Sequence, residues 1–311
     1  MNIVFMGTPD FAVPSLRALI EGGHTVSAVF TQPDKPKGRG MKLTPPPVKE
    51  YAVSQGIEVY QPQSLKRETE TVTPLIKSLA PDCIVVAAYG KLLPPEILEI
   101  PRFGCVNVHG SLLPKYRGAA PIQWTVLNGD EYGGVTTMLM AEGMDTGDIL
   151  LQTSVKVGAS ETSAELYDRL SFVGAELLIK TLSALSDGSI TPVPQDHAEA
   201  TLAPMLSKEM SPTDFSRTAS EVRAHINGLC DWPCATAVLD GKKLRLCRCE
   251  VVSMNGFHTA GEVLDEKDFT IGCGEGSVRL LEVQPEGSRR MPAKDYLRGH
   301  PVSREAILSP E

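Results

Sequence analysis

The first 110 residues alternate between short apolar runs and segments whose apolar positions recur at helical spacing. The run at 83–88, Cys-Ile-Val-Val-Ala-Ala, is nearly continuous, which is typical of a strand buried on both faces of a parallel sheet. Strands are expected at 3–6, 25–30, 58–60 and 83–88, and helices at 14–21, 47–55 and 71–79. This βαβ spacing predicts an α/β fold with an open, doubly wound, mostly parallel sheet.

The second half has a different pattern. Thr162 and Glu165 precede an apolar helical repeat and form a capping-box signal for a long helix ending near Leu185. Prolines then accumulate across 190–206, which predicts a linker between a domain at 1–189 and a domain at 207–311. In the second domain we expect a helix at 221–229 and short strands at 235–239, 243–249, 261–264, 270–273 and 277–284. Short strands separated by Gly and Asp turns predict a small β-barrel.

The charge of the chain limits its partners. A chain of 311 residues is long enough for two domains, and its net charge of -8 argues against a protein whose whole surface coats nucleic acid. One basic segment stands out, because no acidic residue occurs between Lys35 and Lys49. Its glycines and prolines predict a long exposed loop, which is either a solvated surface loop or a local contact to nucleic acid. Its basic residues are Lys35, Lys37, Arg39, Lys42 and Lys49.

The sequence also bears on location. The chain begins directly with an apolar strand, so no signal or transit peptide is expected, and no run of 18 apolar residues predicts a membrane span. Seven cysteines, an odd number, fit free thiols. We therefore expect a cytoplasmic protein.

The cysteines do not predict a metal site. Cys230-Asp-Trp-Pro-Cys234 and Cys247-Arg-Cys249 lack the two-residue spacing of zinc knuckles and have no nearby histidine. Cys83 and Cys105 occur in apolar strand patterns and are expected to be buried like small hydrophobic residues.

The segment 105–114 carries the chemistry. In an extended strand alternate side chains share a face, so Cys105, Asn107 and His109 point one way while Val106 and Val108 point the other. An amide and an imidazole therefore lie side by side on an otherwise apolar strand.

A Gly-rich loop supplies carboxylates to the same region, from Asp145 or Asp148. Amide, imidazole and carboxylate are the groups needed to stabilise an oxyanion and move a proton. The strand ends at 6–8, 88–90 and 109–110 belong to the edge where such sheets bind ligands. Residues 7–11 lack the Gly-x-Gly-x-x-Gly turn, so a dinucleotide cofactor is not expected.

Five motifs occur in one order: Gly7-Thr-Pro-Asp-Phe11, 32–40, Asn107-x-His-Gly-Ser-Leu-Leu-Pro114, 115–121 and 138–148. In these motifs the chain closely resembles the 10-formyltetrahydrofolate-dependent formyltransferases. The resemblance covers nearly the whole chain and is strongest before residue 160. It implies a Rossmann-like formyltransferase domain followed by an OB-like barrel that assists RNA binding. It also implies a transferase that uses 10-formyltetrahydrofolate as donor, methionyl initiator tRNA as acceptor, and neither metal nor nucleotide.

The resemblance also assigns residues. It selects Asp145 over Asp148 and implies catalytic roles for Asn107, His109 and Asp145. It places the basic segment at the acceptor stem of the tRNA, through Lys35, Lys37, Arg39 and Lys42. It implies a folate pocket along Ser111, Leu112, Leu113 and Pro114. Tyr89 and Gly90 are further candidates for this pocket.

Some alternatives stay open on the residues alone. Leu112 and Leu113 could be ordinary core residues, and Tyr116 and Arg117 either face the tRNA end or close the loop. A formyltransferase with the same donor and a small amine acceptor, such as glycinamide ribonucleotide or an amino sugar, would share the site. So would a hydrolase of the same folate, whereas a non-enzymatic RNA-binding protein would not need it. A monomer is expected.

Overall fold

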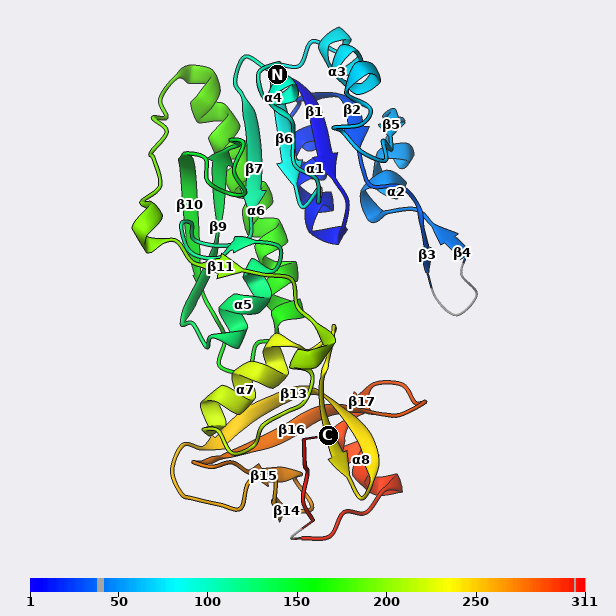
Figure 1. The fold of residues 1–311 in the computed structure, drawn as a ribbon, viewed down its shortest axis with the longest axis vertical. Coiled ribbons are helices and arrows are strands. Elements are labelled where there is room, and N and C mark those ends of the chain that lie inside the picture. Colours follow the sequence, from blue (N-terminus) through cyan, green and yellow to red (C-terminus); the bar gives the residue numbers. More distant parts are fainter. Residues whose placement is uncertain (38–41, 305, 311) are drawn as a thin grey trace. The chain divides into compact units, whose positions relative to one another are not determined.

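The computed structural model describes residues 1–37, 42–304 and 306–310. This part of the chain forms two compact units (Figure 1). The first comprises the described residues of 1–119, with 134–155 and 167–203, and the second comprises 120–133, 156–166 and the described residues from 204 onward. The domain limits expected from the sequence, 1–189 and 207–311, stay predictions.

In the described residues, the first unit is built on a seven-stranded sheet. β1 pairs in parallel with β2 and β6, and the pairs β2–β5 and β6–β7 are also parallel, whereas β9 runs antiparallel to β7. In the order of pairing, the strands are β10 (Ile149–Lys156), β9 (Tyr132–Leu139), β7 (Cys105–His109), β6 (Cys83–Ala87), β1 (Asn2–Gly7), β2 (Thr25–Phe30) and β5 (Val59–Tyr60).

Side chains from both faces of this sheet pack against helices. On one face, Gly174 lies so close to Val108 that a Cβ added to it would come within 2.9 Å of Val108 Cγ1. On the other face, Val86 belongs to a buried cluster with Ile76. The doubly wound, mostly parallel sheet is therefore confirmed. The helices are α1 (Val13–Glu21), α2 (Pro47–Ser54), α3 (Thr69–Ser78), α4 (Pro95–Leu98) and α6 (Ser163–Asp187).

The strand order fixes where a ligand can bind. From β1 the chain builds β2 and β5 on one side and then returns to place β6 and β7 on the other side. The connections after β1 and β6 therefore diverge, and sheets of this topology bind ligands in a crevice at the carboxyl ends of these strands. Thr8 Oγ1 and Gln32 Nε2 both donate hydrogen bonds to the Tyr89 carbonyl, at 3.2 and 3.0 Å, and tie the three connections together.

The basic segment is more regular than predicted. Residues expected to form a loop instead form a short antiparallel hairpin of β3 (Lys35–Lys37) and β4 (Lys42–Thr44), in which Lys35 pairs with Thr44 (Figure 1). The prediction of a loop was wrong for these residues because Pro36 is tolerated in a two-stranded ribbon, where one edge of each strand needs no partner.

Strong local signals were reliable for the long helix. The Thr162 amide donates to Glu165 Oε2 at 2.9 Å, and the Glu165 amide donates to Thr162 Oγ1 at 3.2 Å. This reciprocal pair confirms the capping box at the start of α6. Within the described residues, no helix is long and apolar enough to cross a membrane.

The second unit contains an antiparallel sheet in the order β12-β13-β16-β15-β14, with β17 paired to β16. Its two edge strands both bond to the C-terminal segment. Val238 of β12 exchanges hydrogen bonds with Ser309, and the Val263 amide of β14 donates to the Ala306 carbonyl. The segment closes the sheet into the predicted barrel. The strands are β12 (Ala235–Leu239), β13 (Lys242–Ser253), β14 (Val263–Asp265), β15 (Thr270–Gly272), β16 (Ser277–Pro285) and β17 (Met291–Pro292).

In the described residues, the α-helices α5 (Pro121–Leu127), α7 (Ala219–Gly228) and α8 (Ala293–Gly299) accompany the barrel. Buried residues of α7, such as Val222 and Ile226, share one core cluster with the barrel strands. All seven cysteines of the chain are free and buried. Burial of Cys83 and Cys105, which are 0% and 2% exposed, was predicted from their apolar strands.

Candidate active site

Strand β7 presents an amide and an imidazole at its carboxyl end. Cys105 faces the cluster between the sheet and α3, so strand alternation places Asn107 and His109 on that same face. Both are largely buried, at 9% and 5% exposure. In the described part of the chain, the Asn107 side chain makes no hydrogen bond. Its NH2 group is therefore available to a ligand.

The two ring nitrogens of His109 have different neighbours. Nε2 lies 2.9 Å from the Tyr116 carbonyl, which can only accept a hydrogen bond, so Nε2 carries a proton and donates it. Nδ1 lies 3.7 Å from Asp145 Oδ1. In the neutral ring Nδ1 is an acceptor, and an ionised carboxylate is an acceptor too. Nδ1 and the Asp145 carboxylate can therefore share a proton, or both accept from a ligand that donates one. This makes Nδ1 the reactive nitrogen.

The Asp145 carboxylate is also fixed through its other oxygen, Oδ2. The Gly118 amide donates to Asp145 Oδ2 at 2.9 Å, which leaves Oδ1 toward His109. Asp145 has φ 52°, a left-handed conformation that non-glycine residues rarely adopt. Such strain persists where the surroundings hold it and is frequent at functional sites. Asp148, the competing carboxylate, makes no ion pair to His109 within the described residues.

Gln195 supports this geometry, although the sequence placed it only in the linker. Its Nε2 donates to the backbone carbonyls of Asp145 and Gly147, at 2.9 and 2.7 Å. Its Oε1 accepts from Arg117 Nε and Nη2, at 3.0 and 2.7 Å. Both side chains are buried, at 6% for Gln195 and 8% for Arg117. Arg117 therefore closes the loop, one of the two roles left open by the sequence.

A small parallel ladder brings these residues together. β8 (Arg117–Gly118) pairs with β11 (Leu202–Ala203), so the segment that contains Gln195 runs beside the one that follows the active-site strand. A two-residue strand has no periodicity to detect. Gln195 is one of several polar residues in 190–206, so the sequence did not distinguish it from its neighbours.

The candidate folate segment is fixed by its own hydrogen bonds. Ser111 Oγ donates to the Lys115 carbonyl at 2.6 Å, and Thr136 Oγ1 donates to the Ser111 carbonyl at 2.6 Å. Leu112 occupies the space beside Gly134, where an added Cβ would come within 2.5 Å of Leu112 Cδ2. Leu113 is buried and Pro114 half-buried. The segment is thus a rigid turn whose two leucines are packed within the protein.

The further pocket candidates differ from each other. The Tyr89 side chain is 1% exposed and lies in the core cluster, so its ring does not line the crevice. Gly90 is exposed, and Gln32 Nε2 approaches its carbonyl to 3.3 Å. Of these two residues, only Gly90 is exposed enough to contact a ligand.

The basic residues are also distinguished by the structure. Lys35 and Lys42 are exposed on the β3–β4 hairpin. Lys49 lies on α2 and is paired with Asp34 at 2.8 Å, so its charge is already matched. Lys37 lies in β3, and Arg39 lies outside the described residues. Across the described residues, no group of three or more His, Cys, Asp or Glu side chains could hold a metal.

Comparison with known proteins gives one family. Residues 1–182 match the formyl transferase family, and residues 205–301 match the formyl transferase C-terminal domain. Methionyl-tRNA formyltransferase of Caldanaerobacter subterraneus subsp. tengcongensis is 50% identical over 309 residues, which cover 99% of this chain and 100% of that protein. The enzyme of the same name from Clostridium novyi is 46% identical over 310 residues, with coverage of 99% and 100%.

Solved structures share the fold. An N-formyltransferase from Helicobacter canadensis, in complex with folinic acid and dTDP-3-aminofucose, has a TM-score of 0.69 at 18% identity and covers 91% of this chain and 98% of its own. HypX from Aquifex aeolicus, in complex with tetrahydrofolic acid, has a TM-score of 0.65 at 18% identity and covers 95% of this chain and 46% of its own. Because both of its domains match family models and its relatives match over their full length, the chain belongs to the formyltransferase family.

Proposed function

We propose that this protein transfers the formyl group of 10-formyltetrahydrofolate to the α-amino group of methionine on initiator tRNA, forming N-formylmethionyl-tRNA for translation initiation. Two full-length relatives that carry the name methionyl-tRNA formyltransferase are 50% and 46% identical to this chain. The observation that carries the chemistry is the unpartnered Asn107 amide beside His109 and Asp145 at one strand end.

Asn107 is the oxyanion donor in this proposal. When the amine attacks the formyl carbon, the formyl oxygen gains negative charge and becomes a better acceptor for the Asn107 NH2 group. Since this amide has no partner in the described protein, it loses no hydrogen bond when it turns to the ligand. Donors of this kind contribute about 3 to 4 kcal/mol to the transition state.

His109 and Asp145 handle the protons. The Tyr116 carbonyl holds the ring through Nε2, so proton exchange takes place on the Nδ1 side, which faces Asp145 Oδ1. The attacking amine loses one proton, to Asp145 directly or through water, as the new carbon–nitrogen bond forms. The bond from the formyl carbon to the folate nitrogen breaks, and His109 takes the amine's proton from Asp145 at Nδ1 and passes it to this nitrogen. The products are the formylated amine and tetrahydrofolate.

Gln195 and Arg117 act as positioning residues for this reaction. In the described residues their side chains make no hydrogen bond to Asn107 or His109, but four hydrogen bonds of the Gln195 side chain hold the Asp145 loop against the chain at Arg117. A carboxylate in a strained backbone conformation needs such support to stay beside its partner. The folate would lie along 111–114 and at Gly90, where the backbone is rigid.

The remaining assignments follow from the same proposal. Residues 1–189 would form the catalytic domain, 190–206 the linker, and 207–311 an OB-like domain that binds tRNA. Lys35, Lys37, Arg39 and Lys42 would contact the acceptor stem. The enzyme would act as a cytoplasmic monomer and would need no metal or nucleotide cofactor.

The test is an acceptor competition. Purified protein is given formyl-labelled 10-formyltetrahydrofolate with methionyl initiator tRNA, glycinamide ribonucleotide, an amino-sugar nucleotide, or no acceptor. We expect label in N-formylmethionine, recovered after mild hydrolysis of the tRNA ester, and no acceptor-independent formate. Label in a small amine instead would support the rival transferase, and free formate would support a hydrolase.

A further inference from the structure

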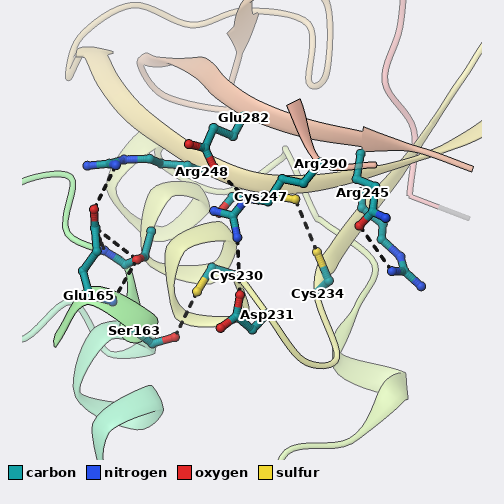
Figure 2. A network of polar contacts seen from close by, with 12 residues as sticks. Ser163, Glu165, Cys230, Asp231, Cys234, Arg245, Cys247, Arg248, Glu282 and Arg290 are labelled. Atoms are coloured by element: carbon teal, nitrogen blue, oxygen red, sulfur yellow. Dashed lines mark hydrogen bonds and ion pairs between the residues drawn. The ribbon is translucent and has the colours of Figure 1, made fainter. Parts of the chain in front are cut away.

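Two buried thiols face each other at the start of the barrel. Cys234 directly precedes β12 and Cys247 lies within β13. Ala235 pairs with Leu246 in the antiparallel ladder, so Cys234 and Cys247 are opposed one position further along. Their Sγ atoms are 3.9 Å apart, and Figure 2 shows the two side chains pointing at each other. Among the described cysteines, no other two share a hydrogen bond between sulfurs.

The backbone suits a covalent bond between them. Opposed residues of an antiparallel pair have Cα atoms about 4.5 to 5.5 Å apart. Disulfides span about 4.4 to 6.8 Å between Cα atoms. Between Leu246 and Arg248 the register of β13 against β16 shifts, which makes Cys247 part of a bulge that directs its side chain. Cys234 adopts a left-handed φ of 69°. The sulfurs, 3.9 Å apart, approach to about 2.05 Å when the bond forms.

The surroundings make Cys247 the more reactive thiol. A hydrogen bond from Cys234, together with the nearby Arg290 cation, lowers the pKa of Cys247 despite its burial. Arg290 is held in place by Glu282 and Asp231, at 2.6 and 3.3 Å (Figure 2). A lowered pKa raises the fraction of thiolate, which is the nucleophilic form.

The other cysteines lack these features. Cys230 lies close in the sequence, but its Sγ contacts Ser163 Oγ at 3.4 Å and burial raises its pKa (Figure 2). Burial is the main cause that raises the pKa of Cys83 and Cys273 to about 12. Burial also raises the pKa of Cys105 and Cys249. Among the seven cysteines, only Cys247 has both a lowered pKa and a thiol neighbour.

We propose that Cys234 and Cys247 form a modification site at which hydrogen peroxide, a two-electron oxidant, creates an intramolecular disulfide in the folded protein. The Cys247 thiolate attacks one peroxide oxygen and the O–O bond breaks, which gives sulfenic acid and hydroxide; the hydroxide takes up the proton that the thiol released and becomes water. The Cys234 sulfur then attacks the sulfenic sulfur and releases the second water. Two thiols and one peroxide thus yield one disulfide and two waters.

Access is through the turn that precedes Cys234. Asp231 has a side-chain exposure of 68%, and Trp232 is 56% exposed. Local opening of an exposed turn requires less free energy than opening of the sheet it borders. The site lies wholly within the second unit, so its chemistry does not depend on the proposed formyl transfer.

Peptide mapping tests the proposal on the full chain. Reduced, folded protein is treated with hydrogen peroxide, free thiols are alkylated, and the protein is digested with trypsin without reduction. Cys247 then lies alone in peptide 246–248, and Cys234 lies in 224–242 with Cys230. Cleavage before Asp231 separates Cys230 from Cys234. We expect an intact mass lower by two hydrogens and one linked pair, Cys234 with Cys247.

Variants complete the test. Cys234→Ser should abolish the loss of two hydrogens, while Cys230→Ser, which removes the adjacent thiol, should leave it unchanged. The mapping of the unaltered protein stands even if a variant folds poorly. A disulfide between Cys230 and Cys247, or a sulfinic acid at Cys247 with Cys234 still alkylated, would overturn the proposal.

Discussion

Gln195 and Asp145 are 50 residues apart in the chain and are joined by a hydrogen bond of 2.9 Å from Gln195 Nε2 to the Asp145 carbonyl. The Gln195 amide also donates to Gly147 and accepts twice from Arg117. Both amide protons and both oxygen lone pairs of this buried side chain are therefore in use. Gln195 thus holds the backbone of the Asp145 loop, while the Gly118 amide orients the carboxylate toward His109.

Gln195→Glu should separate positioning from binding. The substitution keeps the shape but replaces two donors with acceptors that repel the carbonyls of Asp145 and Gly147. Displacement of a reacting group by about 1 Å costs about 100-fold in rate, so we expect kcat to fall by about that factor with KM for methionyl-tRNA little changed. The pH profile of kcat should shift too, because the variant alters the surroundings of Asp145. The matched control is Gln55→Glu, on an exposed residue; equal activities for the two variants would refute the positioning role.

The three candidate catalytic residues should affect the chemical step. Asn107→Ala should lower the single-turnover rate by about 100- to 1000-fold through loss of the oxyanion donor. His109→Ala and Asp145→Asn should each lower it by about 100- to 10,000-fold, with affinity for tRNA nearly unchanged. Asp148→Asn is the control, because Asp148 is the carboxylate that does not pair with His109. A normal single-turnover rate for any of the three variants would remove that residue from the chemistry.

Salt dependence tests the basic hairpin. Lys35→Ala and Lys42→Ala should each reduce the slope of log K for tRNA against log salt by about 0.7 to 0.9, the value for one lost phosphate contact. Lys49→Ala should leave the slope unaltered, since this lysine is already paired with Asp34. Binding titrations at several salt concentrations measure the slopes. Identical slopes in the three variants and the original protein would exclude the hairpin as a phosphate contact.

Buried His225 should make the free energy of unfolding depend on pH. Its Nε2 is buried without a hydrogen-bond partner in the described structure, and burial lowers the pKa of His225 from its usual 6.5. The unfolded chain takes up a proton near that usual value, whereas the folded protein resists it. Protonation therefore favours unfolding, and stability contributed by neutral His225 is present above pH 6.5 and is lost as the pH falls below it.

Denaturant titrations should show this between about pH 7.5 and about pH 5.5, the range in which histidines change charge. His225→Gln should flatten the decline in the free energy of unfolding across that range. His197→Gln, on an exposed histidine, should not. If the slopes of both variants equal that of the original protein, His225 is not the source of the acid sensitivity.

Much of the architecture was predictable from short stretches of sequence. β2 was expected at 25–30 and β12 at 235–239, and both have those bounds. The Thr162 and Glu165 capping box marked the start of α6. These signals are local, because apolar alternation and capping chemistry act between residues only a few positions apart.

The misses have a common origin in long-range pairing. The β3–β4 hairpin was expected to be a loop, because Pro and Gly obscured three-residue strands that are stabilised only by facing each other. The closure of the barrel by 306–309 had no signal in the sequence. Its hydrogen bonds join Ala306 to Val263 and Ser309 to Val238, which are more than 40 and more than 70 positions away, respectively. The role of Gln195 at the site was missed for the same reason, because its partners lie about 50 to 80 positions away.

The sequence by itself determined that Asn107 and His109 share one face of a buried strand, because alternation along a strand is a property of its own backbone. It also determined the βαβ order that brings this strand to the ligand-binding edge of the sheet. Only the tertiary structure decided that Asp145 stands 3.7 Å from His109, and that Gln195 and Gly118 hold it there. Such contacts depend on hydrogen bonds between segments far apart in the chain, and these exist only once the whole sheet has formed.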